Sequence, residues 1–86
     1  MTIVKVRLFA ALRELAGASE VEAEGATVAE VIDVLSARYG ERFSQIARVG
    51  SVVVDGERAS PATALAGGEE VAVLPPVSGG ARPDPS

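Results

Sequence analysis

One segment of this chain constrains the fold more than any other: residues 27–40 form its clearest helical pattern, and stretches with strand-like alternation flank it. Thr27, followed three residues later by Glu30, has the form of a capping box, which satisfies free backbone N–H groups at a helix start. Apolar residues then recur at helical spacing until Gly40, a typical helix stop. One helix covers only one face of a sheet. The pattern therefore predicts a mixed sheet with one main helix packed on one face.

The flanking stretches alternate as strands do. Residues 2–9 place Val4, Val6 and Leu8 on one side of the chain and basic residues on the other, which is typical of a half-buried strand. The other predicted elements are a short helix at 10–17, a strand at 19–24, a single helical turn at 41–47, a strand over 51–59 that runs into the turn Asp55-Gly56, and a last strand at 69–74.

This order of elements is typical of the α+β class and of ubiquitin-like β-grasp domains, and a ferredoxin-like fold is the alternative, which needs a second full helix. At 86 residues the chain forms one domain with one core and no deep pocket. The predicted core is Val4, Val6, Leu8, Val28, Val31, Ile32, Leu35, Val52, Val54, Val71 and Val73.

Composition excludes several classes of function. The chain has no cysteine and no histidine, which excludes disulfides, the usual zinc sites, thiol nucleophiles and imidazole acid–base catalysis, and we expect no metal site. A net charge of −4 argues against nucleic-acid binding. The N-terminal residues lack the pattern of a secretory signal, and no apolar run is long enough for a membrane helix. We therefore expect a cytoplasmic protein.

The segment LPPVSGG at residues 74–80 carries the functional signal. The two prolines cannot donate ladder hydrogen bonds, so they end the last strand and hold the chain extended as it leaves the domain. The two glycines have no Cβ, so a partner can close tightly around their backbone. We expect a flexible arm over 75–80. The presenting residues are Pro75, Pro76, Val77, Ser78 and Gly79, and the arm ends at Gly80.

Two stretches, VRLFAALRELAG at 6–17 and GGEEVAVLPPVSGG at 67–80, resemble the MoaD/ThiS family of ubiquitin-like sulfur carriers, most closely the small subunits of molybdopterin synthase. The resemblance covers residues 1–80. It implies that the carboxylate of Gly80 is adenylated by an E1-like adenylyltransferase/sulfurtransferase and then converted to a thiocarboxylate that donates sulfur. The partner would use ATP and Mg²⁺, and this chain, which is not itself an enzyme, would bind no cofactor. The sulfur acceptor would be the large subunit of molybdopterin synthase or another sulfur-accepting enzyme.

The sequence departs from the family pattern after the second glycine. Gly80 is amide-bonded to Ala81, so the chain as written has no free carboxylate at that position. We expect a processing peptidase, with metalloproteases as the candidate class, to cleave between Gly80 and Ala81 and to remove residues 81–86, a disordered tail. The alternatives are a carrier that has lost its function and a tail that was added artificially.

Other functions remain open at this level. Within the carrier class, sulfur could go to thiamine-thiazole or cysteine biosynthesis instead of molybdopterin. A ubiquitin-like protein modifier would use the same Gly80 acyl-adenylate but end as an isopeptide on a target lysine. A structural or toxin-like binding module would not need Gly80 at all.

A candidate docking patch follows from strand parity. Phe9 shares parity with the basic residues of the first strand, and Leu74 likewise falls outside the inward set of the last strand. In a β-grasp sheet the first and last strands are parallel neighbours. Phe9 and Leu74 are therefore predicted to lie together on the helix-free face, beside the arm, as a partner-binding pair.

Overall fold

The computed structural model describes residues 2–76, and these form one mixed five-stranded sheet in the order β2-β1-β5-β3-β4. β5 is parallel to β1 and antiparallel to β3, and the outer pairs β1–β2 and β3–β4 are antiparallel. The elements are β1 (Ile3–Leu8), α1 (Ala11–Ala16), β2 (Glu20–Glu24), α2 (Val28–Tyr39), α3 (Glu41–Val49), β3 (Ser51–Val54), β4 (Glu57–Ala59) and β5 (Glu70–Leu74).

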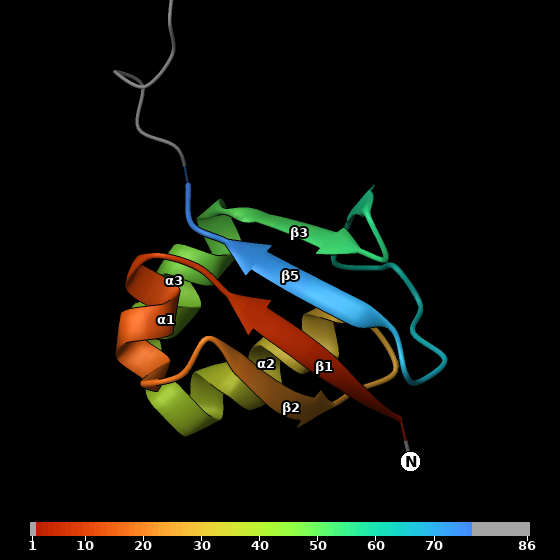
Figure 1. Ribbon diagram of the computed structural model, residues 1–86, viewed down its shortest axis with the longest axis horizontal. Helices are drawn as coiled ribbons and strands as arrows, with labels where there is room; N and C mark the ends of the chain where they lie inside the picture. The colour runs from red at the N-terminus through yellow and green to blue at the C-terminus, as the bar shows by residue number, and fades with distance from the viewer. Residues whose placement is uncertain (1, 77–86) are drawn as a thin grey trace, which may run out of the picture.

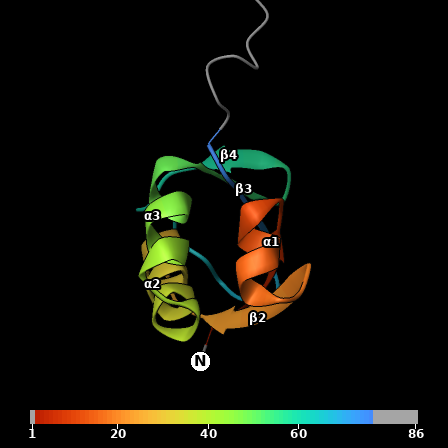
Figure 2. The same cartoon turned by 90° about the vertical axis from the view of Figure 1, so that its left-hand side faces the viewer.

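The mixed sheet confirms the β-grasp prediction. Figure 1 shows the sheet in front of α2 and α3, with α1 at the end toward which β1 and β5 point. Figure 2 looks at that end and shows α1 beside the α2–α3 pair. β1 and β2 are adjacent and antiparallel, so the six-residue α1 lies within a hairpin connection, which argues against the ferredoxin-like alternative. The other face of the sheet carries no helix among the described residues.

The cap of α2 forms as the sequence indicates. The Glu30 N–H donates to Thr27 Oγ1 at 3.2 Å, and the Glu30 carboxylate accepts the Ala26 N–H at 2.8 Å. At the other end the Gly40 N–H donates to the Ser36 carbonyl. Gly40 has a φ of 104°, a backbone conformation that favours glycine. The capping residues therefore fix both ends of the main helix.

α3 is the main correction to the predicted elements. The sequence pattern predicted a single turn at 41–47, but the structure contains a nine-residue helix. Phe43 and Ala47, one turn apart, are both buried, and the Phe43 ring lies 5.4 Å from that of Tyr39. Arg48 pairs with Asp33 of α2 at 2.7 Å. Tertiary packing onto α2 thus stabilises a helix that is marginal on its own.

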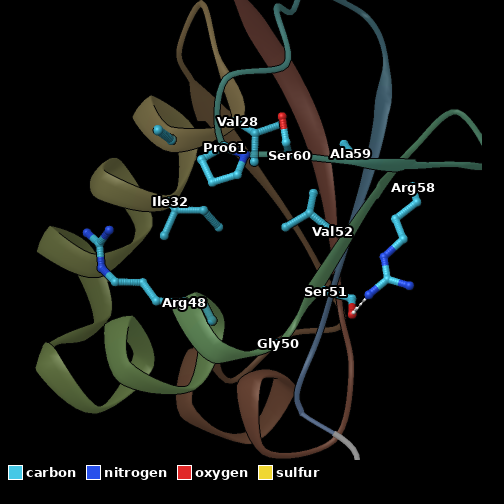
Figure 3. A pocket seen from close by; sticks show the side chains of 12 residues that line it. Val28, Ile32, Arg48, Gly50, Ser51, Val52, Arg58, Ala59, Ser60 and Pro61 are labelled. Atoms are coloured by element: carbon cyan, nitrogen blue, oxygen red, sulfur yellow. Dashed lines mark hydrogen bonds between the residues drawn. The ribbon is translucent and has the colours of Figure 1, made fainter.

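The core lies between the sheet and the helices. Nine of the predicted core residues are buried, but Val52 and Val54 of β3 are only half-buried. Figure 3 shows the reason for Val52, which lines a groove between β3 and the α2–α3 pair. The buried residues outside the predicted set are Leu12, Ala23, Phe43, Ala47 and Leu65.

The predicted turn Asp55-Gly56 is confirmed as the link between β3 and β4. Both residues have positive φ, 50° for Asp55 and 88° for Gly56, as a two-residue hairpin turn of type I′ requires. In residues 2–76 no helix has the length and apolar character that crossing a membrane would require.

Candidate functional site

β5 carries the chain toward the predicted site. It occupies a central position in the sheet, and its last residue, Leu74, pairs with Ser51 of β3. Pro75 is half-buried beyond this pair and Pro76 is exposed. The remaining predicted site residues, Val77, Ser78, Gly79, Gly80 and Ala81, lie outside the described residues.

The two predicted docking residues lie where the pairing of β1 with β5 ends. Leu8 and Val73 form the last pair of this register, and Phe9 and Leu74 each follow it by one residue. Phe9 is 39% exposed and lines the same shallow hollow as Arg7 of the helix-free face, whereas Leu74 is half-buried. Ala72 and Val53 form a cross-strand pair on this face and extend the apolar surface. We call Phe9, Val53, Ala72 and Leu74 the exit face.

Charged groups surround the exit face. Arg7 is opposite Ala72 and pairs with Glu70 at 2.8 Å, and Arg58 is opposite Val53 and donates to Ser51 Oγ at 3.4 Å. On the outer strand β2, three exposed carboxylates lie in line: Glu20, Glu22 and Glu24. These edge charges oppose sheet-to-sheet association. The apolar residues beside Pro75 are therefore the surface best suited to bury against a partner.

The start of β5 is held by carboxylates. Glu69 accepts the backbone N–H groups of Ala66 and Gly67, both at 2.7 Å, and these hydrogen bonds lower the pKa of its carboxyl group below the ordinary value. Asp55 Oδ1 accepts the Glu70 N–H at 3.0 Å, and the Asp55 N–H donates to the Glu70 carbonyl. These hydrogen bonds thus fix the start of β5 to the turn at Asp55 and to the loop at Ala66 and Gly67.

Sequence reasoning missed Gly50, which adjoins the end of β5. It follows α3 and precedes β3, where a glycine is ordinarily explained as a helix stop. A Cβ on Gly50 would overlap the Leu74 carbonyl oxygen and lie 3.2 Å from the Pro75 carbonyl carbon. No local pattern could reveal this contact, because its two sides are more than twenty residues apart in sequence.

The groove in Figure 3 lies between α2, α3, β3 and β4, and its lining includes Gly50 and Ser51, which adjoin Leu74. Its floor is apolar, with Ile32, Val52 and Pro61 pointing into it, and Arg48 stands at its rim. Within residues 2–76, no three acidic side chains gather as metal ligands would. The polar groups of the groove do not converge on one point, so the groove offers no arrangement for catalysis.

Comparison with known proteins identifies relatives over nearly the whole chain. The model of the ThiS family matches residues 6–80. Small archaeal modifier protein 1 of Haloferax volcanii is 35% identical over an alignment 88 positions long, which covers 86% of this chain and 97% of that protein. The structure of a putative molybdopterin converting factor, subunit 1, from Pyrococcus furiosus has a TM-score of 0.77 and 33% identity, covering 90% of this chain and 100% of that one.

A further relative was solved with a partner. A chain of the Amycolatopsis orientalis BexX/CysO complex has a TM-score of 0.74 and 28% identity, covering 87% of this chain and 97% of that one. Chains of this fold thus occur in complexes with other proteins.

Proposed function

This chain belongs to the ThiS family of ubiquitin-like sulfur carriers, and we propose that it is a carrier whose Gly80 delivers sulfur to an acceptor enzyme. The observation that carries the proposal is the position of β5: it is a central strand that ends at Leu74, and Gly80 follows six residues later in the sequence (80 − 74). The family match also ends at residue 80, so the residues from Ala81 onward lie beyond it. Both facts support Gly80 as the reactive end.

The proposed chemistry needs a free carboxylate at Gly80. In the first step the carboxylate attacks ATP at the α-phosphorus, and pyrophosphate leaves. In the second, a sulfur nucleophile displaces AMP from the acyl-adenylate, which yields the thiocarboxylate. An E1-like adenylyltransferase/sulfurtransferase supplies the nucleotide, Mg²⁺ and the sulfur, and this chain supplies the carbonyl group and its presentation. A peptidase, which we propose to be a metalloprotease, first cleaves between Gly80 and Ala81.

Among sulfur acceptors we favour the large subunit of molybdopterin synthase. The similarity to the Pyrococcus furiosus protein supports this choice, since that protein is described as subunit 1 of a molybdopterin converting factor. Cysteine and thiamine-thiazole biosynthesis are the alternatives. The exit face would bind both the adenylating enzyme and the acceptor. We place the function in the cytoplasm, where ATP is present.

The experiment compares two forms of the chain with the adenylating enzyme, ATP, Mg²⁺ and a sulfur donor. The chain that ends at Gly80 is expected to gain the mass of one sulfur in place of one oxygen, and the full-length chain to stay unchanged, because an amide carbonyl cannot be adenylated. Intact-mass spectrometry reads both results. A chain that ends at Gly79 is the matched control: it keeps a terminal glycine but is one residue short. Equal reaction of the full-length chain would refute the proposal.

A second candidate function is protein modification. It is favoured by the 35% identity to a protein named as a small archaeal modifier. The acyl-adenylate would be the same, but the product would be an isopeptide on a lysine of a target protein. Purification under denaturing conditions separates the two functions, because conjugates survive it as species of higher mass whereas a thiocarboxylate leaves a single small chain. Lys5 is the only lysine in the sequence, which leaves one position for self-conjugation.

A further inference from the structure

Residue 50 has to be glycine because there is no room for a Cβ at this position, and not because of its backbone angles. Its φ of −88° and ψ of −154° are open to other residues. A Cβ at this position would overlap the Leu74 carbonyl oxygen, and it would lie 3.0 Å from the Leu74 carbonyl carbon and 3.2 Å from that of Pro75. All three are backbone atoms, which cannot rotate away as a flexible side chain can. Any side chain at residue 50 must therefore displace the end of β5 from β3.

The displaced residues are the ones from which the arm departs. Leu74 and Ser51 form the last pair between β3 and β5, and Pro75 and Pro76 add no N–H groups that could extend the ladder. The start of β5 is held independently by Asp55 and Glu69. A side chain at residue 50 would therefore change the direction of the exit and leave the other end of the strand in place.

A small change of direction here has a large effect at the far end. Gly80 is five positions after Pro75 in the sequence (80 − 75), and a partner that holds this segment extended would stretch it over about 17 Å. A tilt of about 10° at Pro75 would move the far end by about 3 Å over that span. A misplacement of about 1 Å at a reacting group can cost about a hundredfold in rate.

We propose that Gly50 is a positioning residue: by leaving room for Leu74 and Pro75, it aims residues 75–80 into the site of the adenylating partner. This inference rests on the proposed carrier function. Gly50 touches neither nucleotide nor reacting carboxylate. Gly50 affects the reaction by setting the direction in which the chain leaves β5. The exit face affects it by setting the affinity for the partner.

The test uses the chain that ends at Gly80 and measures acyl-adenylate formation by the adenylating enzyme with ATP and Mg²⁺. Gly50→Ala is expected to lower kcat by about tenfold or more and to change KM by less than about twofold, because the reacting end is misplaced while Phe9 remains to bind. Gly25→Ala is the matched control. Its Cβ would meet the Val31 backbone nitrogen at 2.8 Å, so it also crowds backbone, less severely than the overlap at Gly50 and away from the exit.

A rescue separates positioning from a general loss of structure. One glycine inserted between Pro76 and Val77 lengthens the arm by up to about 3.5 Å, and it is expected to restore part of kcat in Gly50→Ala while lowering kcat in the unsubstituted chain. The proposal is overturned if Gly50→Ala keeps full kcat, if kcat falls equally in Gly25→Ala, or if Gly50→Ala fails to fold, since Gly50 would then belong to the core. If the unsubstituted chain forms no acyl-adenylate, the carrier function itself fails.

Discussion

The two ends of β5 are fixed in different ways. At its start, carboxylates hold the backbone: Asp55 accepts the Glu70 N–H, and Glu69 accepts two N–H groups of the preceding loop. At its end, no side-chain hydrogen bond holds Leu74 or Pro75 among the described residues, and the close approach of Gly50 sets the path. Side-chain hydrogen bonds thus fix the start of the strand. The path of its end depends instead on the space that Gly50 leaves by having no Cβ.

Because of this difference, the start of β5 affects the stability of the domain, whereas its end affects how the following residues meet a partner. Hydrogen bonds at the start can be strengthened or weakened with no consequence for a partner that binds at the other end. The apolar residues beside the exit contribute little to the buried core, so they are free to serve recognition. Substitutions of Asp55 and Phe9 should therefore have opposite signatures: lower stability with normal binding at Asp55, and a folded domain with weaker binding at Phe9.

The largest expected effect is on stability, at Asp55. Asp55→Ala removes the acceptor for the Glu70 N–H and places alanine at a φ of 50°, so the free energy of unfolding should fall by about 2 kcal/mol. Urea denaturation followed by circular dichroism measures the loss. Asp55→Asn is the matched control, since asparagine tolerates the same φ and keeps a side-chain acceptor. An equal loss in both variants would show that the hydrogen-bond acceptor and the backbone angle do not fix this end.

The next effect is on binding, at Phe9. Phe9→Asp should weaken binding to the adenylating enzyme by about tenfold or more while the domain stays folded, because Phe9 is 39% exposed. Isothermal titration calorimetry and thermal unfolding test the two expectations. Ile3→Asp is the control: Ile3 is 46% exposed on the same strand, at its opposite end. Loss of folding in Phe9→Asp would show instead that Phe9 belongs to the core.

The smallest effect is a pH dependence at Glu69. The Ala66 and Gly67 N–H groups lower the pKa of the Glu69 carboxyl from 4.5, so the stabilisation is complete above that value and is lost as the pH falls below it through the folded-state pKa. Glu69→Gln should therefore lose less stability than the parent chain between about pH 6 and about pH 3. Urea denaturation at several pH values measures this. Glu57→Gln, which removes one charge from β4, should retain the parent pH dependence.

The fold could largely be predicted because its signals are local. The Thr27 cap, the alternation of β1 and the turn at Asp55-Gly56 each depend on a few neighbouring residues, and all three are confirmed. The full length of α3 could not be predicted, because its stability comes from Phe43 packing beside Tyr39 and from the ion pair of Arg48, both of which depend on α2. The half-buried state of Val52 also depends on distant residues, because Val52 lines the groove between β3 and the helices.

The candidate site divides in the same way. Phe9 and Leu74 could be placed from strand parity, and each follows the last β1–β5 pair by one residue. Their role in binding stays a prediction, as do the chemistry of Gly80 and the cleavage before Ala81. Gly50 could not be found, because its requirement arises from contact with backbone distant in sequence. Sequence patterns report interactions between residues that are close in the sequence. A close contact between segments far apart in the sequence produces no such pattern.

The central position of β5 has a consequence for the order of folding. Lys5 pairs with Glu70 across 65 residues of sequence (70 − 5), so the sheet closes through one of the longest loops that the chain allows. Until β5 is in place, β1 and β3 each have one unpaired edge and the two halves of the sheet remain separate. The strand that completes the domain is also the one that carries the arm. A chain that stops before β5 therefore has neither a closed sheet nor residues 75–80, so these residues follow a folded domain only after β5 has closed the sheet.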